Sequence, residues 1–160
     1  MTTHVLVLVL ALLIGVVAGL RSLTAPAVVA WAALLDWINM DGTWASWVGH
    51  PVTVAVLTIL AILELVADKL PATPSRTAAI GFVARIVLGA FAGAVIGTAW
   101  GYRWSSLGAG AVGAVLGTLG GYEARTRLGT AHGHDLPIAL LEDTVAVLGG
   151  FAIAVTTAVL

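Results

Sequence analysis

Long apolar runs separated by short polar stretches make up most of the chain. The runs are Val5–Leu20, Leu23–Ile38, Pro51–Ala67, Ala78–Trp100, Ser105–Tyr122 and Pro137–Leu160. A helix needs roughly 20 apolar residues to cross the hydrocarbon core of a bilayer, so the pattern predicts a bundle of about six membrane helices. The first two runs are shorter than this, and only Arg21 and Ser22 separate them. Either they form a tight hairpin that thins the bilayer locally, or Leu23–Ile38 is re-entrant and does not cross.

The composition also places this bundle in a membrane. Of the 160 residues, 60% are hydrophobic and 9% are charged, and the mean hydropathy is +1.07. Soluble domains carry about 25% charged residues, so a soluble fold of this length would lack the charges to cover its surface. We predict an all-α integral membrane protein in which residues 1–160 form one transmembrane domain surrounded by lipid. The formal net charge of -1 offers no basic surface for nucleic acid.

Glycine is frequent, with 19 residues, and two of the apolar runs place it at regular spacing. Gly89, Gly93 and Gly97 follow a strict four-residue period, and Gly113 and Gly117 repeat that spacing in the next run. Small residues at this spacing lie on one face of a helix and let two backbones approach closely. We therefore predict that these five glycines pack helices against each other. Glycine alone does not indicate a pore.

The positive residues and the aromatic residues suggest an orientation. If all six runs cross, one side holds the basic residues Arg21, Lys69, Arg76, Arg125 and Arg127, and the other side holds only Arg103. Positive residues mark the cytoplasmic side, so both termini are predicted to be periplasmic. Six aromatic residues would then share the outer interface: Trp37, Trp44, Trp47, Trp100, Tyr102 and Trp104. We expect the segment Asn39–His50 to lie flat along that interface.

Six charged residues fall within or at the ends of the apolar runs. They are Arg21, Glu64, Asp68, Arg85, Glu142 and Asp143. On the six-helix map they come from four runs and share one layer in the inner half of the membrane. Buried charges must pair or face water, so one interpretation is a set of structural ion pairs that fixes how the helices pack. The other is a polar vestibule for a cation or a proton, because four carboxylates face two arginines.

Two expectations follow from this layer. Arg85 should pair with at least one of the four carboxylates, because a lone guanidinium in lipid is costly. Glu64 and Glu142 each close a similar tetrapeptide, Ala-Ile-Leu-Glu and Ala-Leu-Leu-Glu, which places one carboxylate at comparable depth on two helices. Replacing either with glutamine should harm function more than folding if both face water.

Other candidate sites carry weaker signals. The stretch His132–Asp135 contains two histidines but no third ligand fixed by spacing, so we predict no metal site. Ser22, Thr24 and Pro26 at the first break could hold a substrate on unwound backbone or form a simple turn. The chain contains no cysteine, phosphate-binding glycine loop, Ser-His-Asp arrangement or metalloprotease helix. We therefore expect no cofactor and no enzyme activity.

Three motifs in order give the chain a family resemblance. They are Gly19-Leu20-Arg21, the stretch Glu64–Pro71 and Leu141-Glu142-Asp143. They resemble a family of small bacterial membrane proteins catalogued as domain of unknown function 4126, over nearly the whole chain. The stretch Thr73–Thr77 is similar to a shorter branch of that family. The resemblance implies a bacterial inner-membrane protein and implies no activity.

These observations favour a small polytopic transporter or channel for a cation or a proton-coupled small solute. The alternative is a non-transporting structural, assembly or lipid-binding protein whose charges only form ion pairs. Six short helices leave little room for an enclosed path, so we expect a homo-oligomer, with a dimer favoured. The sequence does not identify the substrate.

Overall fold

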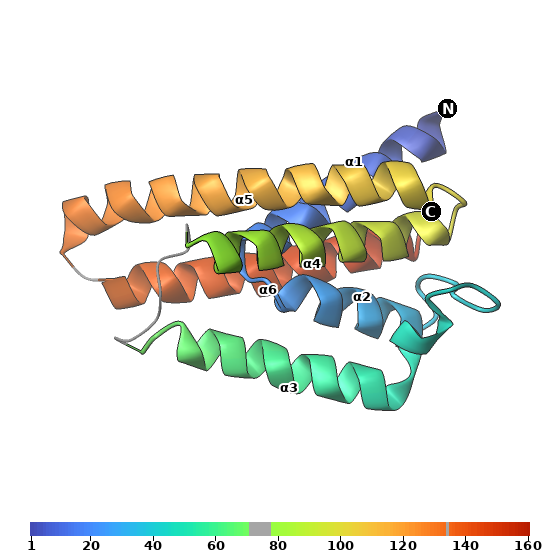
Figure 1. Cartoon of the computed structure of the whole chain (residues 1–160), viewed down its shortest axis with the longest axis horizontal. Coiled ribbons are helices and arrows are strands. Elements are labelled where there is room, and N and C mark those ends of the chain that lie inside the picture. Colours follow the sequence, from blue (N-terminus) through green and yellow to red (C-terminus); the bar gives the residue numbers. More distant parts are fainter. Residues whose placement is uncertain (71–77, 134) are drawn as a thin grey trace.

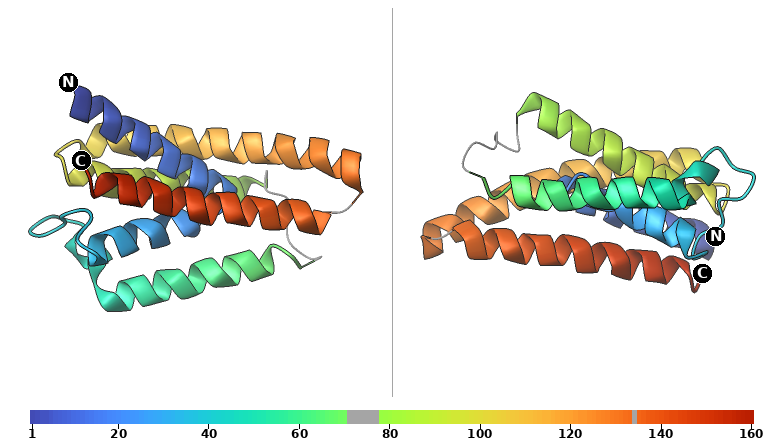
Figure 2. Two further views of the ribbon diagram at one scale, coloured as in Figure 1. Left: turned by 180° about the vertical axis from the view of Figure 1, so that it is seen from behind. Right: turned by 90° about the horizontal axis from the view of Figure 1, so that it is seen from below.

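The computed structural model describes residues 1–70, 78–133 and 135–160, and these contain only helices, turns and loops. The elements are α1 (Thr2–Leu20), α2 (Thr24–Leu34), the short 3-10 helix η1 (Ser46–Gly49), α3 (Pro51–Ala67), α4 (Ala79–Thr98), α5 (Arg103–His132) and α6 (Asp135–Thr157). The helices run roughly along one axis and both termini lie at the same end of the bundle (Figures 1 and 2). The protein is thus an all-α polytopic bundle, as the apolar pattern predicts.

The helices differ in how well their lengths fit a bilayer. Within the described residues, three are long and apolar enough to cross by length and composition: α1, α4 and α6. Glycines and a charged last third lower the hydropathy of α5, and α2 and α3 are apolar but shorter. With 11 residues, α2 is about 16 Å long, roughly half of a 30 Å hydrocarbon core. The second apolar run is therefore a half-length helix that follows a break inside the bundle.

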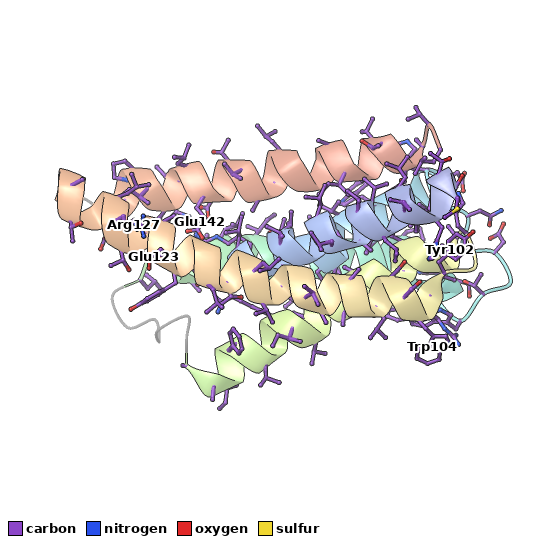
Figure 3. All side chains as sticks on the ribbon, turned by 90° about the horizontal axis from the view of Figure 1, so that it is seen from above. Tyr102, Trp104, Glu123, Arg127 and Glu142 are labelled. Carbon is purple, nitrogen blue, oxygen red and sulfur yellow. The ribbon has the colours of Figure 1, made fainter. Side chains whose placement is uncertain are left out.

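Helix α5 is longer than the fifth apolar run, which ends at Tyr122 in the sequence pattern. It continues to His132, and an ion pair one turn apart, Arg127 Nε to Glu123 Oε1 at 2.6 Å, lies on this extension. The helix ends where Gly133 takes a left-handed conformation with φ 67°. The extension projects at the end of the bundle opposite the termini, where Figure 3 labels Glu123 and Arg127.

The aromatic residues gather at the end that holds the termini, where Figure 3 labels Tyr102 and Trp104. There the Trp44 indole N–H donates to Thr98 Oγ1 at 2.9 Å, and the Arg103 guanidinium lies 4.5 Å from the Trp104 ring centre. The segment Asn39–His50 lies at this end as well, and its expected position along the membrane interface stays a prediction. It folds onto the bundle and buries apolar side chains, including Ala45 and Val48, which are both fully covered.

Close packing of α1, α4 and α5 forms the centre of the bundle. A Cβ atom placed on Gly113 would lie 2.9 Å from the carbonyl carbon of Leu12, and one on Gly117 would lie 2.9 Å from Val16 Cα. Such distances are shorter than van der Waals contact, so only glycine allows α1 and α5 to approach this closely.

The second glycine stripe lies where α4 meets α5. Cβ atoms placed on Gly89 and Gly93 would lie 2.9 Å from Gly110 O and 3.0 Å from Gly110 Cα. One on Gly97 would lie 2.7 Å from Tyr102 O, where the chain turns from α4 into α5. All five predicted packing glycines are therefore at close backbone approaches, whereas α3 lies at the edge of the bundle and packs mainly on α2 and η1 (Figure 1).

The first prediction compares two glycines of α5. Gly113→Ala should destabilise the protein by about 1–3 kcal/mol, because the new methyl group must push α1 away. Gly108→Ala should be neutral or stabilising by up to about 1 kcal/mol, because the space around Gly108 is open and alanine favours the helix. Thermal unfolding of both variants in detergent measures the difference. Equal melting temperatures would contradict the packing role of Gly113.

Candidate functional site

The break between α1 and α2 is the centre of the candidate site. Helix α1 ends at Leu20, and Arg21 is extended, with φ -140° and ψ 105°. Pro26 explains the break locally, because a proline ring clashes with the carbonyl four residues earlier in a continuous helix but is tolerated in the first turn of a new one. The new helix starts at Thr24, two residues before the proline. The break leaves the first backbone N–H groups of α2 without partners in a helix.

Glu64 of α3 accepts hydrogen bonds from the two backbone N–H groups that directly precede α2. The backbone N–H of Ser22 donates to Glu64 Oε1 at 2.8 Å, and that of Leu23 donates to Glu64 Oε2 at 2.7 Å. The Ser22 hydroxyl donates to Oε1 as well. Both carboxylate oxygens are therefore used, and the negative charge lies at the positive end of the α2 dipole. Glu64 acts as an N-cap supplied by another helix, in place of the side-chain cap that α2 itself lacks.

Arg21 is fully buried and joins three helices through its guanidinium group. Nη1 contacts Asp68 Oδ2 at the end of α3, and Nε donates to Asp143 Oδ1 of α6 at 2.5 Å. Nη2 lies 4.0 Å from Glu142 Oε2, which is longer than a hydrogen bond. The guanidinium is thus surrounded by carboxylates, as a buried charge in an apolar bundle requires.

Lys69 is a member of the site that the sequence did not identify. Its Nζ lies 2.5 Å from Asp143 Oδ2 and 2.6 Å from Leu65 O, so it forms an ion pair and also binds a free carbonyl at the end of α3. Asp143 therefore bridges two cations with its two oxygens. The sequence pattern places Lys69 in a loop between two apolar runs, although its position next to Asp68 at a helix end is a signal that it could reach the same partners.

Arg85 is the predicted member of the charged layer that lies on α4. It is buried, with 8% of its surface exposed, one turn before Gly89 on α4. Among the described residues, Arg21 pairs with Asp68, Glu142 and Asp143, and Lys69 pairs with Asp143. Arg85 has an interaction partner as well, and its expected pairing with one of the four carboxylates stays a prediction.

We refer to Arg21, Ser22, Leu23, Glu64, Asp68, Lys69, Glu142 and Asp143 as the break site. It lies away from the aromatic end, and Figure 3 labels Glu142 on the same half of the bundle as Glu123 and Arg127. Two cations and four carboxylates meet here among the described residues. Burial in a low-dielectric bundle makes a carboxylate hold a proton more readily, whereas a neighbouring cation favours its charged form.

Of the weaker candidates, Ser22 belongs to the break site. His134, the side chain of His132 and the turn Pro71–Thr77 lie outside the described residues. In the parts that the structure describes, no group of three His, Cys, Asp or Glu side chains could hold a metal ion.

With this geometry established, the chain can be compared with known proteins. The sequence profile of the family described as Domain of unknown function (DUF4126) matches residues 8–160, so the chain belongs to this family. No curated protein and no solved structure matches the chain.

The second prediction tests Glu64 as a cap. In Glu64→Gln one acceptor oxygen becomes an NH2 group, which faces a backbone N–H as a second donor and cannot accept from it. We expect a loss of about 1–3 kcal/mol of stability, larger than the sequence alone suggested for this residue. Glu123→Gln is the matched control, since its pair with Arg127 is exposed and contributes less than about 0.5 kcal/mol. A Glu64→Gln variant that melts with the wild type would contradict the cap.

Proposed function

We propose that this member of the family is a small transporter or channel, for a cation or a proton-coupled small solute, and not an enzyme. The observation that carries the proposal is the attachment of α3 to the break through ionised side chains. Glu64 caps α2, Asp68 pairs with Arg21, and Lys69 pairs with Asp143 of α6. Because these contacts require carboxylates in their charged form, a bound proton or cation weakens them.

The packing of α3 supports a movable element. Only Val54 and Ala61 of this helix are buried, and it lies at the edge of the bundle against α2 and η1 (Figure 1). In lipid there is no hydrophobic force that holds one helix to another, so polar contacts have a large share in deciding where an edge helix lies. When a proton or cation occupies the break site, α3 can separate from α2 and α6 and open a path between them.

The alternative is a non-transporting structural, assembly or lipid-binding protein. The cap by Glu64 favours it specifically, because that carboxylate has a complete structural task without any ligand. The two functions differ at Glu142. Its carboxylate lies 4.0 Å from Arg21 Nη2. It takes no part in the cap of α2 or in the two shorter ion pairs of Arg21.

The membrane and the assembly state are part of the proposal. We place the protein in the bacterial inner membrane with both termini in the periplasm, supported by the positive residues of the sequence and by the shared end of the two termini (Figure 2). Exposed apolar side chains on α3 and α4, such as Ile59, Ile80 and Val83, are available to lipid or to a second copy in a homodimer.

The third prediction separates transport from structure. In liposomes with an imposed pH gradient, the wild-type protein should dissipate the gradient faster than empty liposomes. Glu142→Gln should lower this flux at least about tenfold while the melting temperature stays near the wild type, because Arg21 keeps Asp68 and Asp143. Glu123→Gln should leave both unchanged. A wild type no faster than empty liposomes, or normal flux in Glu142→Gln, would reject the proposed role.

The fourth prediction concerns orientation. A reporter that is active only in the periplasm should be active when fused after Leu160 and inactive when fused after Leu128, because the two positions lie at opposite ends of the bundle. The reversed pattern would place the termini in the cytoplasm. Activity at both positions would show that α6 does not cross.

A further inference from the structure

A cavity of about 180 Å³ lies between α2, α3 and α6, next to the break site. Its lining includes Thr24, Trp31, Thr58, Ala61, Val147 and Phe151. It begins beside the first residue of α2, one position after the Leu23 N–H that Glu64 caps. No charged side chain lines it, so its chemistry differs from that of the break site.

The hydroxyl of Thr24 gives this cavity a buried polar group. Thr24 is 4% exposed, and its Oγ1 has no hydrogen-bond partner among the described residues. Other helical threonines donate to the carbonyl four residues earlier, as Thr58 does to Val54 O and Thr118 does to Ala114 O, both at 2.7 Å. Thr24 is the first residue of α2, so the residue four positions earlier, Leu20, belongs to α1 and not to the same helix. A buried hydroxyl without a partner is costly, and a ligand in the cavity can satisfy it.

The second hydroxyl of the cavity is already engaged. Thr58 Oγ1 donates to Val54 O and accepts from the Trp31 indole N–H at 3.0 Å. This fixes the Trp31 ring as one wall. The remaining walls are aliphatic or aromatic, and a cavity of about 150 Å³ with such walls binds a molecule as large as benzene. The space therefore fits an apolar body of that size with one polar group directed at Thr24.

We propose that this cavity binds a small neutral molecule that has an apolar body and a single hydroxyl or similar hydrogen-bonding group. Thr24 exchanges hydrogen bonds with that group, and the walls from α2, α3 and α6 contact the body. A charged ligand is excluded because no opposite charge lines the cavity. The inference rests on the proposed function only where it names this molecule as the solute that is carried, because the binding itself requires no transport.

The test uses phenol as the probe and toluene as its partner without a hydroxyl. The full-length protein is labelled with 5-fluorotryptophan in detergent, and the Trp31 resonance is identified by its loss in Trp31→Phe. In the wild type both probes should shift this resonance in a saturable way. In Thr24→Val, which keeps the shape and removes the hydroxyl, the Kd of phenol relative to that of toluene should rise about fivefold. Taking this ratio cancels the different partitioning of the probes into detergent.

Thr118→Val is the matched control, because Thr118 is also buried but lies on α5, outside the cavity lining. The ratio should stay at the wild-type value in this variant. A wild type without saturable shifts at Trp31, or an unchanged ratio in Thr24→Val, would overturn the proposal. Saturable binding in a protein without flux would reject transport alone. Flux without binding at Trp31 would reject this cavity alone.

Discussion

Two adjacent backbone N–H groups, those of Ser22 and Leu23, need an acceptor inside a bundle that has almost no polar groups to offer. Water can satisfy such donors in a soluble protein, but in lipid the protein must satisfy them itself. Glu64 does so from α3, and its negative charge interacts favourably with the positive end of the α2 dipole. The position of α3 therefore depends on a break in a different part of the chain, and the hydrogen bonds require the charged form of one carboxylate.

Arg21 extends this dependence to α6. A fully buried guanidinium must be paired, and its partners come from the end of α3 and the first half of α6. Asp143 also pairs with Lys69, which directly follows Asp68 at the end of α3, so α6 is linked to α3 a second time. The half-length α2, the edge helix α3 and α6 are thus joined at one point by charges. The tight centre of α1, α4 and α5 is held by glycine-mediated packing instead.

The sequence predicts the class of fold because hydropathy and the low number of charges are strong signals over long runs. The charged layer was predictable for the same reason, since few charges interrupt those runs. The partners within it were not, because the direction of each side chain depends on how helices rotate against each other. Lys69 illustrates this, as it lies at the end of α3 and reaches Asp143 of α6. The length of α5 was missed because Glu123 and Arg127 read as a loop, whereas their pairing one turn apart suits a helix.

One break accounts for both proposed sites by the same physical rule. Ending α1 at Leu20 and restarting at Thr24 exposes donors that a carboxylate must cap, and it also leaves the Thr24 hydroxyl without the carbonyl that helical threonines normally use. Glu64 satisfies the backbone donors, whereas the Thr24 hydroxyl has no hydrogen-bond partner among the described residues. Because Glu64 lies on α3 and the cavity has α3 as one wall, movement of this helix changes both at once. In the proposed function, this shared helix would couple occupation of the charged site to access to the neutral cavity.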